Sequence, residues 1–240
     1  MKIQSLTEKV QEQRPLTMLI YCQPGVGKST SLGIIAEQSE GRTLILDVDR
    51  TFTTTMSKDE IVHDLSKVDI IQIDNIHTFE DWTNTLRELN DMSKAGTLNW
   101  ENICVDNISE LERCILSDLG SQGKNKGVPA QSDYQYMQFK LVNSLRFMKS
   151  WNKNIFWTAW ETTEHVTNLD GTQYSQKQPK ISAKIVDNIC GLCDVVARVT
   201  VNRERQRGFI LETTGNIYAK NQRDSRRACK VEEFLKGAEQ

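Results

Sequence analysis

The residues best suited to chemistry lie in a short turn that ends in Lys28 and Ser29. An apolar run of strand-forming residues, 17–22, precedes this turn, and a segment with apolar residues at helical spacing follows it. A strand, a glycine-containing turn and a helix in this order are typical of a phosphate-binding loop, or P-loop. Gly25 and Gly27 allow consecutive N–H groups to turn around an anion, and the helix start adds unpaired N–H donors. The pattern therefore predicts a nucleotide phosphate site.

The individual positions of this loop have expected roles. Lys28 should reach the β- and γ-phosphates, and the Ser29 hydroxyl should ligate Mg²⁺. One position departs from the usual pattern, because Cys22 stands where the first glycine is expected. The alternative, a chance Gly-Lys-Ser in a surface turn, is disfavoured because the flanking strand and helix both fit. The residues expected to contact the nucleotide are Gln23, Pro24, Gly25, Val26, Gly27, Lys28, Ser29 and Thr30.

Several carboxylates follow apolar strands and are candidates for metal binding and catalysis. Asp106 ends the strand expected at 102–106, where it would hold Mg²⁺ through a water opposite Ser29. Three carboxylates are candidates for activating the attacking water. Asp47 and Asp49 lie at the end of strand 43–49, and Glu110 lies one helical turn after Asp106. A further strand ends in Thr158 and Glu161, either of which could sense the γ-phosphate. Lys28, Asp49, Asp106 and Glu110 form the candidate catalytic set.

An alternation of strands and helices must position these residues. Strands are expected at 17–22, 43–49, 69–73, 102–106, 154–160, 193–201 and 209–213. Helices are expected at 27–38, 79–94, from 108, 133–151 with Ser132 or Asp133 as cap, 182–189 and 231–236. The fold class is therefore α/β, a mostly parallel sheet with helices on both faces and an antiparallel ribbon near the C-terminus. A hairpin is expected at 163–178 around Asp170-Gly171.

Composition and charge narrow the class of protein. A chain of 240 residues with 38% hydrophobic and 26% charged residues is typical of one globular domain, and we expect neither a signal peptide nor a membrane anchor. Six cysteines indicate reduced thiols in a cytoplasmic chain, and the spacing of Cys190 and Cys193 lacks the second pair that a zinc site needs. The net charge of −2 hides an acidic stretch at 40–119 and two basic stretches at 120–153 and 198–230. Charge alone does not distinguish between two interpretations of these basic stretches, a binding site for a polyanion and a solvated surface.

These motifs resemble a known family. The P-loop, the run LILDVDRTF at 44–52 and the run ICVDNISEL at 103–111 look like the ATPase core of RecA/RadA-type recombinases. The short chain is most similar to the phage-encoded, single-domain RecA-like "AAA" nucleotide-binding proteins. The resemblance implies a RecA-like core at 17–225 between a polar lead-in at 1–16 and a tail at 226–240. It also implies ATP and Mg²⁺ as cofactors, with Asp49 as the residue that activates water.

The resemblance further implies partners. Members act in phage recombination with single-stranded DNA, so we expect this partner, a homo-oligomeric ring or filament and a location in the host cytoplasm. A single-strand-binding protein is a further candidate partner. The run AKNQRD at 219–224 is similar to the motif that reaches a neighbouring subunit's nucleotide, which makes Lys220 and Arg223 candidate trans fingers. The candidate DNA contacts are Lys124, Lys126, Arg203, Arg205 and Arg207.

Two alternative functions remain open at this point. A P-loop kinase of a small molecule or nucleotide would need an arginine-rich lid, whereas residues 120–132 hold lysines and no arginine. A non-hydrolysing, nucleotide-switched binder is suggested by Cys22 in the P-loop and by Asp49 in place of the family's usual glutamate.

Overall fold

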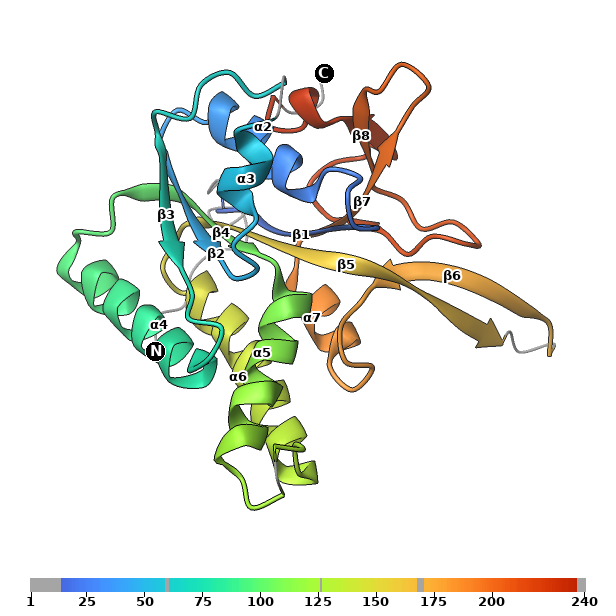
Figure 1. Ribbon diagram of the computed structural model, residues 1–240. Coiled ribbons are helices and arrows are strands. Elements are labelled where there is room, and N and C mark those ends of the chain that lie inside the picture. The colour runs from blue at the N-terminus through green and yellow to red at the C-terminus, as the bar shows by residue number, and fades with distance from the viewer. Residues whose placement is uncertain (1–13, 59–60, 126, 168–170, 237–240) are drawn as a thin grey trace, which may run out of the picture.

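A computed structural model describes residues 14–236 except 59–60, 126 and 168–170 (Figure 1). Its centre is one mixed sheet in the order β10-β8-β7-β1-β5-β4-β2-β3, with β6 paired to β5 and β9 to β7. The strands are β1 Thr17–Cys22, β2 Arg42–Asp47, β3 Val68–Gln72, β4 Trp100–Asp106, β5 Asn154–Thr167, β6 Gln173–Pro179, β7 Val195–Val201, β8 Arg207–Ile210, β9 Lys220–Asn221 and β10 Ala228–Lys230. The six strands from β7 to β3 in this order run parallel, and β6, β8, β9 and β10 are antiparallel to their neighbours.

Two hydrophobic cores cover the two faces of the sheet. Every residue of β1 is buried, and alternate side chains enter opposite cores, as the strand period of two requires. Leu19 and Tyr21 join the core beneath α4, α5, α6 and α7, whereas Met18 and Ile20 join the core beneath α2, α3 and the C-terminal 3-10 turn. Helices therefore lie on both faces of a mostly parallel sheet, and the expected fold class is confirmed (Figure 1).

The helix bounds agree with the periodicity in most places. The helices are α2 Lys28–Gln38, α3 Phe52–Met56, α4 Thr78–Ala95, α5 Ile108–Gln122, α6 Gln131–Lys149 and α7 Val186–Leu192, and the 3-10 turn is Val231–Glu233. The predicted start of α6 was wrong: its N-cap is Ala130, and the Asp133 carboxylate accepts the Ala130 N–H at 2.7 Å from inside the first turn. The helix predicted at 182–189 also begins later, because the Ile185 and Val186 N–H groups close a turn onto Ser182 O.

The predicted hairpin exists as a continuation of β5. Residues Glu161 to Thr167 pair antiparallel with Gln173 to Pro179, so β5 runs out of the sheet into a projecting two-stranded ribbon (Figure 1). Asp170, expected at its turn, lies outside the described residues. Near the C-terminus β10 pairs with β8, so the sheet continues past the expected core boundary at residue 225. None of the helices in the described ranges combines the length and apolar character that a membrane span requires.

Candidate functional site

The P-loop joins the fully buried β1 to the N-terminus of α2. Gly25 and Gly27 have φ angles of 80° and 124°, which side chains disfavour, so the loop depends on glycine at both positions. The Lys28 side chain is drawn inward, and the residue is only 7% exposed. Cys22, in contrast, is the last residue of β1 and has no positive φ. The turn can therefore form with cysteine in place of the first glycine of the usual pattern. Burial raises the pKa of the Cys22 thiol to about 11.

Ser29 and Asp106 face each other across the end of the sheet. The Ser29 hydroxyl donates to Asp106 Oδ2 at 2.6 Å, and the Thr158 hydroxyl donates to Asp106 Oδ1 at 2.5 Å. Burial raises the pKa of Asp106, and these two hydrogen bonds act in the opposite direction. A hydroxyl and a carboxylate are the hard oxygen donors that Mg²⁺ prefers, so this pair fits the expected metal. Thr158, considered a γ-phosphate sensor, instead holds the carboxylate.

Asp49 lies beside this pair and is fixed by hydrogen bonds to both carboxylate oxygens. Its Oδ1 accepts the Thr51 hydroxyl at 2.6 Å and the Thr51 N–H at 3.1 Å, and its Oδ2 accepts the Asn107 amide at 2.8 Å. Asn107 also caps α5, because its Oδ1 accepts the Glu110 N–H at 2.9 Å. The sequence analysis missed Asn107, although an Asn directly before a helix is a recognisable cap signal.

The other two candidates for water activation lie in less suitable places. Asp47 pairs in register with Asp106 and is 0% exposed. Burial, followed by the charges of Asp106 and Asp49, raises the pKa of Asp47 to about 6. The Glu110 carboxylate lies 3.8 Å from Arg113 and contacts the Cys114 thiol, both on its own helix. Asp49 is the carboxylate that is both partly exposed and held beside Asp106.

Strand β5 lies between the P-loop strand β1 and the Asp106 strand β4, which periodicity alone does not reveal. Cys22 pairs in register with Trp160, so the carboxyl ends of these strands converge as expected. Trp157 is fully buried in the core. Glu161, the second proposed γ-phosphate sensor, has a side chain only 2% exposed and accepts from Arg198 Nε at 2.7 Å. Its carboxylate is therefore committed to an internal ion pair.

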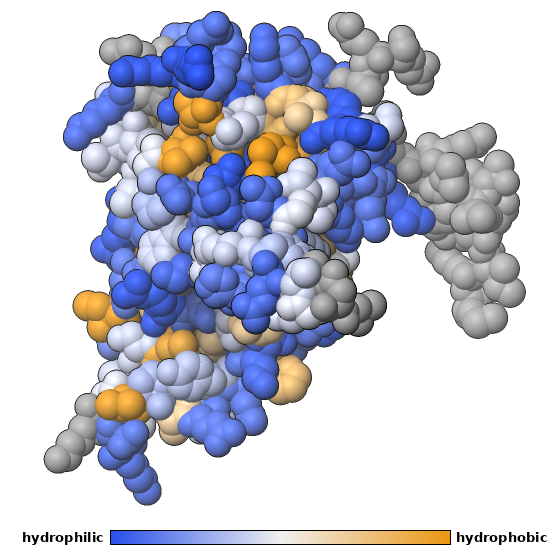
Figure 2. Space-filling model, turned by 90° about the vertical axis from the view of Figure 1, so that its right-hand side faces the viewer, coloured by the Kyte–Doolittle hydropathy of each residue, from blue (hydrophilic) through white to orange (hydrophobic). Residues whose placement is uncertain are grey.

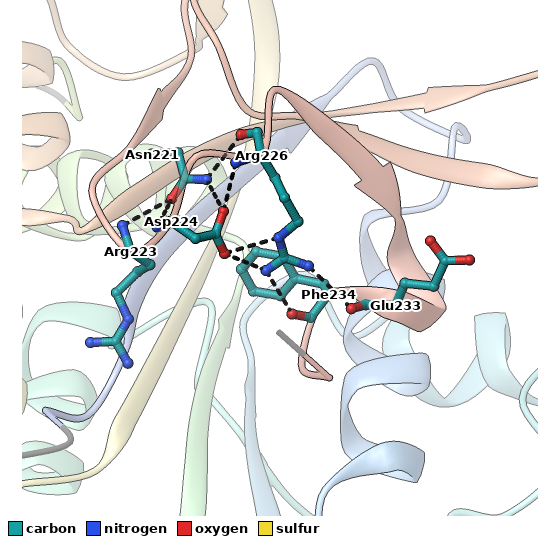
Figure 3. Close-up of polar contacts among 6 residues, drawn as sticks. All are labelled: Asn221, Arg223, Asp224, Arg226, Glu233 and Phe234. Atoms are coloured by element: carbon teal, nitrogen blue, oxygen red, sulfur yellow. Dashed lines mark hydrogen bonds and ion pairs between the residues drawn. The ribbon is translucent and has the colours of Figure 1, made fainter. Parts of the chain in front are cut away.

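The candidate trans fingers have partners within the chain. The Lys220 ammonium donates to the carbonyls of Cys190, Gly191 and Cys193, at the C-terminal end of α7. Arg223 is exposed, and its guanidinium donates to Arg14 O at 2.8 Å. Figure 3 shows that Arg223 points away from a neighbouring cluster in which the Asp224 carboxylate accepts from Arg226. Lys220 therefore binds the carbonyls at the end of α7 in this structure, and Arg223 is the more available of the two.

Arg226 ties the end of the chain to the turn after β9. Its guanidinium lies 2.6 Å from Asp224 Oδ2 and donates to the backbone carbonyls of Glu233 and Phe234 (Figure 3). It also lies over the Phe234 ring. Part of the basic charge at 198–230 is therefore used in contacts within the chain and is not free to bind a partner.

The candidate DNA contacts do not form one group. Lys124 lies in the turn between α5 and α6, at the opposite end of the molecule from the β7–β8 turn that carries Arg203 and Arg205 (Figure 1). All three side chains are exposed, whereas Arg207 is half-buried against the P-loop. Lys126 lies outside the described residues. The side of the molecule from which the ribbon projects is largely hydrophilic, with separate hydrophobic groups (Figure 2).

The Cys190 and Cys193 pair does not form a reactive site. Both thiols are buried at the end of α7, and burial raises the pKa of Cys190 to about 12 and that of Cys193 further. In the described part of the chain, no cluster of three or more His, Cys, Asp or Glu residues could hold a metal ion. A divalent ion at the P-loop would therefore depend on Ser29, Asp106 and the nucleotide phosphates.

Of two comparisons with known proteins, one identifies a family. A comparison with curated proteins found no match. A family model described as an AAA domain matches residues 14–223, which include the P-loop, Asp49 and Asp106. Together with the α/β sheet, this match over most of the chain shows that the protein belongs to the AAA domain family of P-loop ATPases.

Proposed function

We propose that this protein is a Mg²⁺-dependent ATP hydrolase that acts on single-stranded DNA. The observation that carries the hydrolase proposal is the contact of Ser29 with Asp106 at 2.6 Å, directly after a glycine-dependent P-loop. A hydroxyl at the start of the P-loop helix and a buried carboxylate on a nearby strand are the donor set of phosphoryl-transfer sites. ATP is the nucleotide that the resemblance and the family favour.

Each residue of the site has a defined task in this proposal. The P-loop N–H groups and the Lys28 ammonium bind the phosphates, and Ser29 and Asp106 hold the metal ion. When bound, Mg²⁺ offsets the charge that develops on the transferred phosphoryl group. Asp49, fixed by Asn107 and Thr51, orients a water and accepts its proton. The hydrogen bonds restrict rotation of the carboxylate, which favours one orientation of the water.

The DNA partner is supported by exposed cations and by the resemblance to RecA-like phage proteins. Lys124, Arg203 and Arg205 are exposed, and none of them has an ion-pair partner among the described residues. They lie at opposite ends of the molecule, so the proposed assembly would let DNA contact them on different subunits. Assembly into a ring or filament, a role in phage DNA recombination or annealing and a cytoplasmic location are parts of the same proposal.

Phosphate release from ATP tests the proposal directly. We expect Mg²⁺-dependent turnover by the wild type and a loss of about 100-fold or more in Lys28→Ala, because a phosphate-binding cation is removed. Lys94→Ala is the matched control, since that side chain is 72% exposed on α4. Stimulation by single-stranded DNA that is lost in Arg203→Ala/Arg205→Ala would support the DNA role. Phosphate transfer to a nucleoside would favour a kinase, and tight ATP binding without turnover would favour a switch.

A further inference from the structure

Arg207, expected to contact DNA, lies against the P-loop of its own subunit. It is the first residue of β8, and a Cβ placed on Gly27 would be 2.2 Å from its Nε, 2.9 Å from its Cδ and 3.2 Å from its Cζ. The side chain therefore occupies the space that the absence of a Cβ at Gly27 leaves open. Gly27 directly precedes Lys28, so the guanidinium lies beside the phosphate-binding turn.

The backbone around Arg207 is held in place. Arg207 pairs in register with Val201 of β7. In the turn between these strands, the Asn202 side chain accepts the N–H groups of Glu204 and Gln206, and the Asn202 N–H donates to Gln206 O. A turn closed by its own hydrogen bonds presents the following residue in a defined direction. The approach of Arg207 to Gly27 thus follows from the architecture of the β7–β8 turn.

The guanidinium lacks a complete set of partners. Its Nε is shielded from solvent and has no hydrogen-bond acceptor among the described residues. No carboxylate of the described ranges lies within ion-pair distance of it. A buried donor without an acceptor is costly, and a cation beside a P-loop is suited to a phosphate oxygen. The open cleft beside it has a volume of about 890 Å³, and its lining carries the cations Lys58 and Arg205 as well as the carboxylates Glu204 and Glu232.

We infer that Arg207 is a second cationic ligand of the nucleotide, supplied in cis, whose guanidinium donates to the phosphate chain of ATP bound on the P-loop. This inference rests on the proposed function. It gives the β7–β8 turn a role in nucleotide binding, separate from any role of Arg203 and Arg205 in DNA binding. Arginine suits this position better than lysine, because its planar fork can donate two hydrogen bonds to one phosphate.

Competition binding with a fluorescent ADP analogue in the presence of Mg²⁺ tests this role. The competitors are ATP and inorganic tripolyphosphate, which carries the phosphates without base or ribose. In Arg207→Ala we expect both competitors to bind about 10- to 100-fold more weakly, the loss typical of a charged hydrogen bond. Arg207→Lys should recover part of the loss. Arg227→Ala is the matched control, because that side chain is 82% exposed and forms an ion pair with Glu212.

Three results would overturn the inference. They are wild-type affinity in Arg207→Ala, a loss for ATP with unchanged tripolyphosphate binding, and an equal loss in Arg227→Ala. If Arg207→Ala does not fold, Arg207→Lys and Arg207→Gln are compared instead, with the larger loss expected in Gln. The proposed function has a different failure: a wild type that neither binds nor hydrolyses ATP refutes it, whereas an active wild type with an indifferent Arg207→Ala refutes only the role of Arg207.

Discussion

The Thr158 hydroxyl is expected to stabilise both the fold and the Asp106 carboxylate, which is proposed to bind Mg²⁺. It donates to Asp106 Oδ1 at 2.5 Å, and both residues are at most 1% exposed. Thr158→Val nearly preserves the shape of the side chain but removes this donor. A hydrogen bond to a charged group contributes about 1.5–3 kcal/mol, which should be lost from the free energy of unfolding. For a chain of this size, that corresponds to a fall in Tm of about 3–12 °C.

Urea unfolding of the nucleotide-free protein measures this loss. Thr163→Val is the matched control, because Thr163 lies on the same strand in the exposed ribbon and should change stability by less than about 0.5 kcal/mol. In ATP hydrolysis, Thr158→Val should also require more Mg²⁺ for half-maximal rate, since Asp106 is held only by Ser29. A Thr158→Val protein within about 0.5 kcal/mol of the wild type would refute the reasoning.

Three further predictions concern parts of the molecule outside the P-loop. The Arg226 guanidinium lowers the pKa of Asp224 from 3.8 to about 2, so this pair stabilises the fold above pH 3.8 and less as the pH falls toward 2. Asp224→Asn should therefore cost about 1–2 kcal/mol after solvent screening at neutral pH, and its difference from the wild type in unfolding experiments should narrow below pH 4. Arg198→Met should cost about 3 kcal/mol by leaving the buried Glu161 without its closest partner, and Arg198→Met/Glu161→Leu should recover most of this loss; an equally unstable double variant would contradict that account. In native protein treated with a thiol reagent, Cys229 should react first and faster at higher pH, because it alone is partly exposed and burial raises its pKa to about 11; rapid labelling of Cys229→Ser would contradict this.

The P-loop and the general fold could be predicted from local patterns. A glycine-containing turn between a buried strand and a helix depends on neighbouring residues, so the sequence carries the signal directly. The same holds for β4 and Asp106, where an apolar run ends in a carboxylate. Periodicity also identified α4, whose observed bounds differ from the expected 79–94 by one residue at each end.

The partners across the site could not be predicted in this way. The order of strands places Thr158 of β5 beside Asp106 of β4, and no local pattern specifies which strands are neighbours. Asn107 reaches Asp49 over 58 positions of the chain. Arg207 was predicted to contact DNA. Its approach to Gly27 could not be predicted, because it depends on the packing of β8 beside the P-loop. Long-range contacts of this kind arise from topology and not from residue spacing.

The most direct test of the account separates ATP binding from ATP hydrolysis at Asp49. Asp49→Asn should keep the size of the side chain and bind ATP as the wild type does, while its turnover falls about 100-fold or more, because the group that accepts the water's proton is lost. The measurement is single-turnover hydrolysis of ATP with Mg²⁺, beside equilibrium binding of ATP to both proteins. Wild-type turnover with unchanged binding and slow hydrolysis in Asp49→Asn would support the proposed site. Equal rates in the two proteins, or no hydrolysis by the wild type, would contradict it.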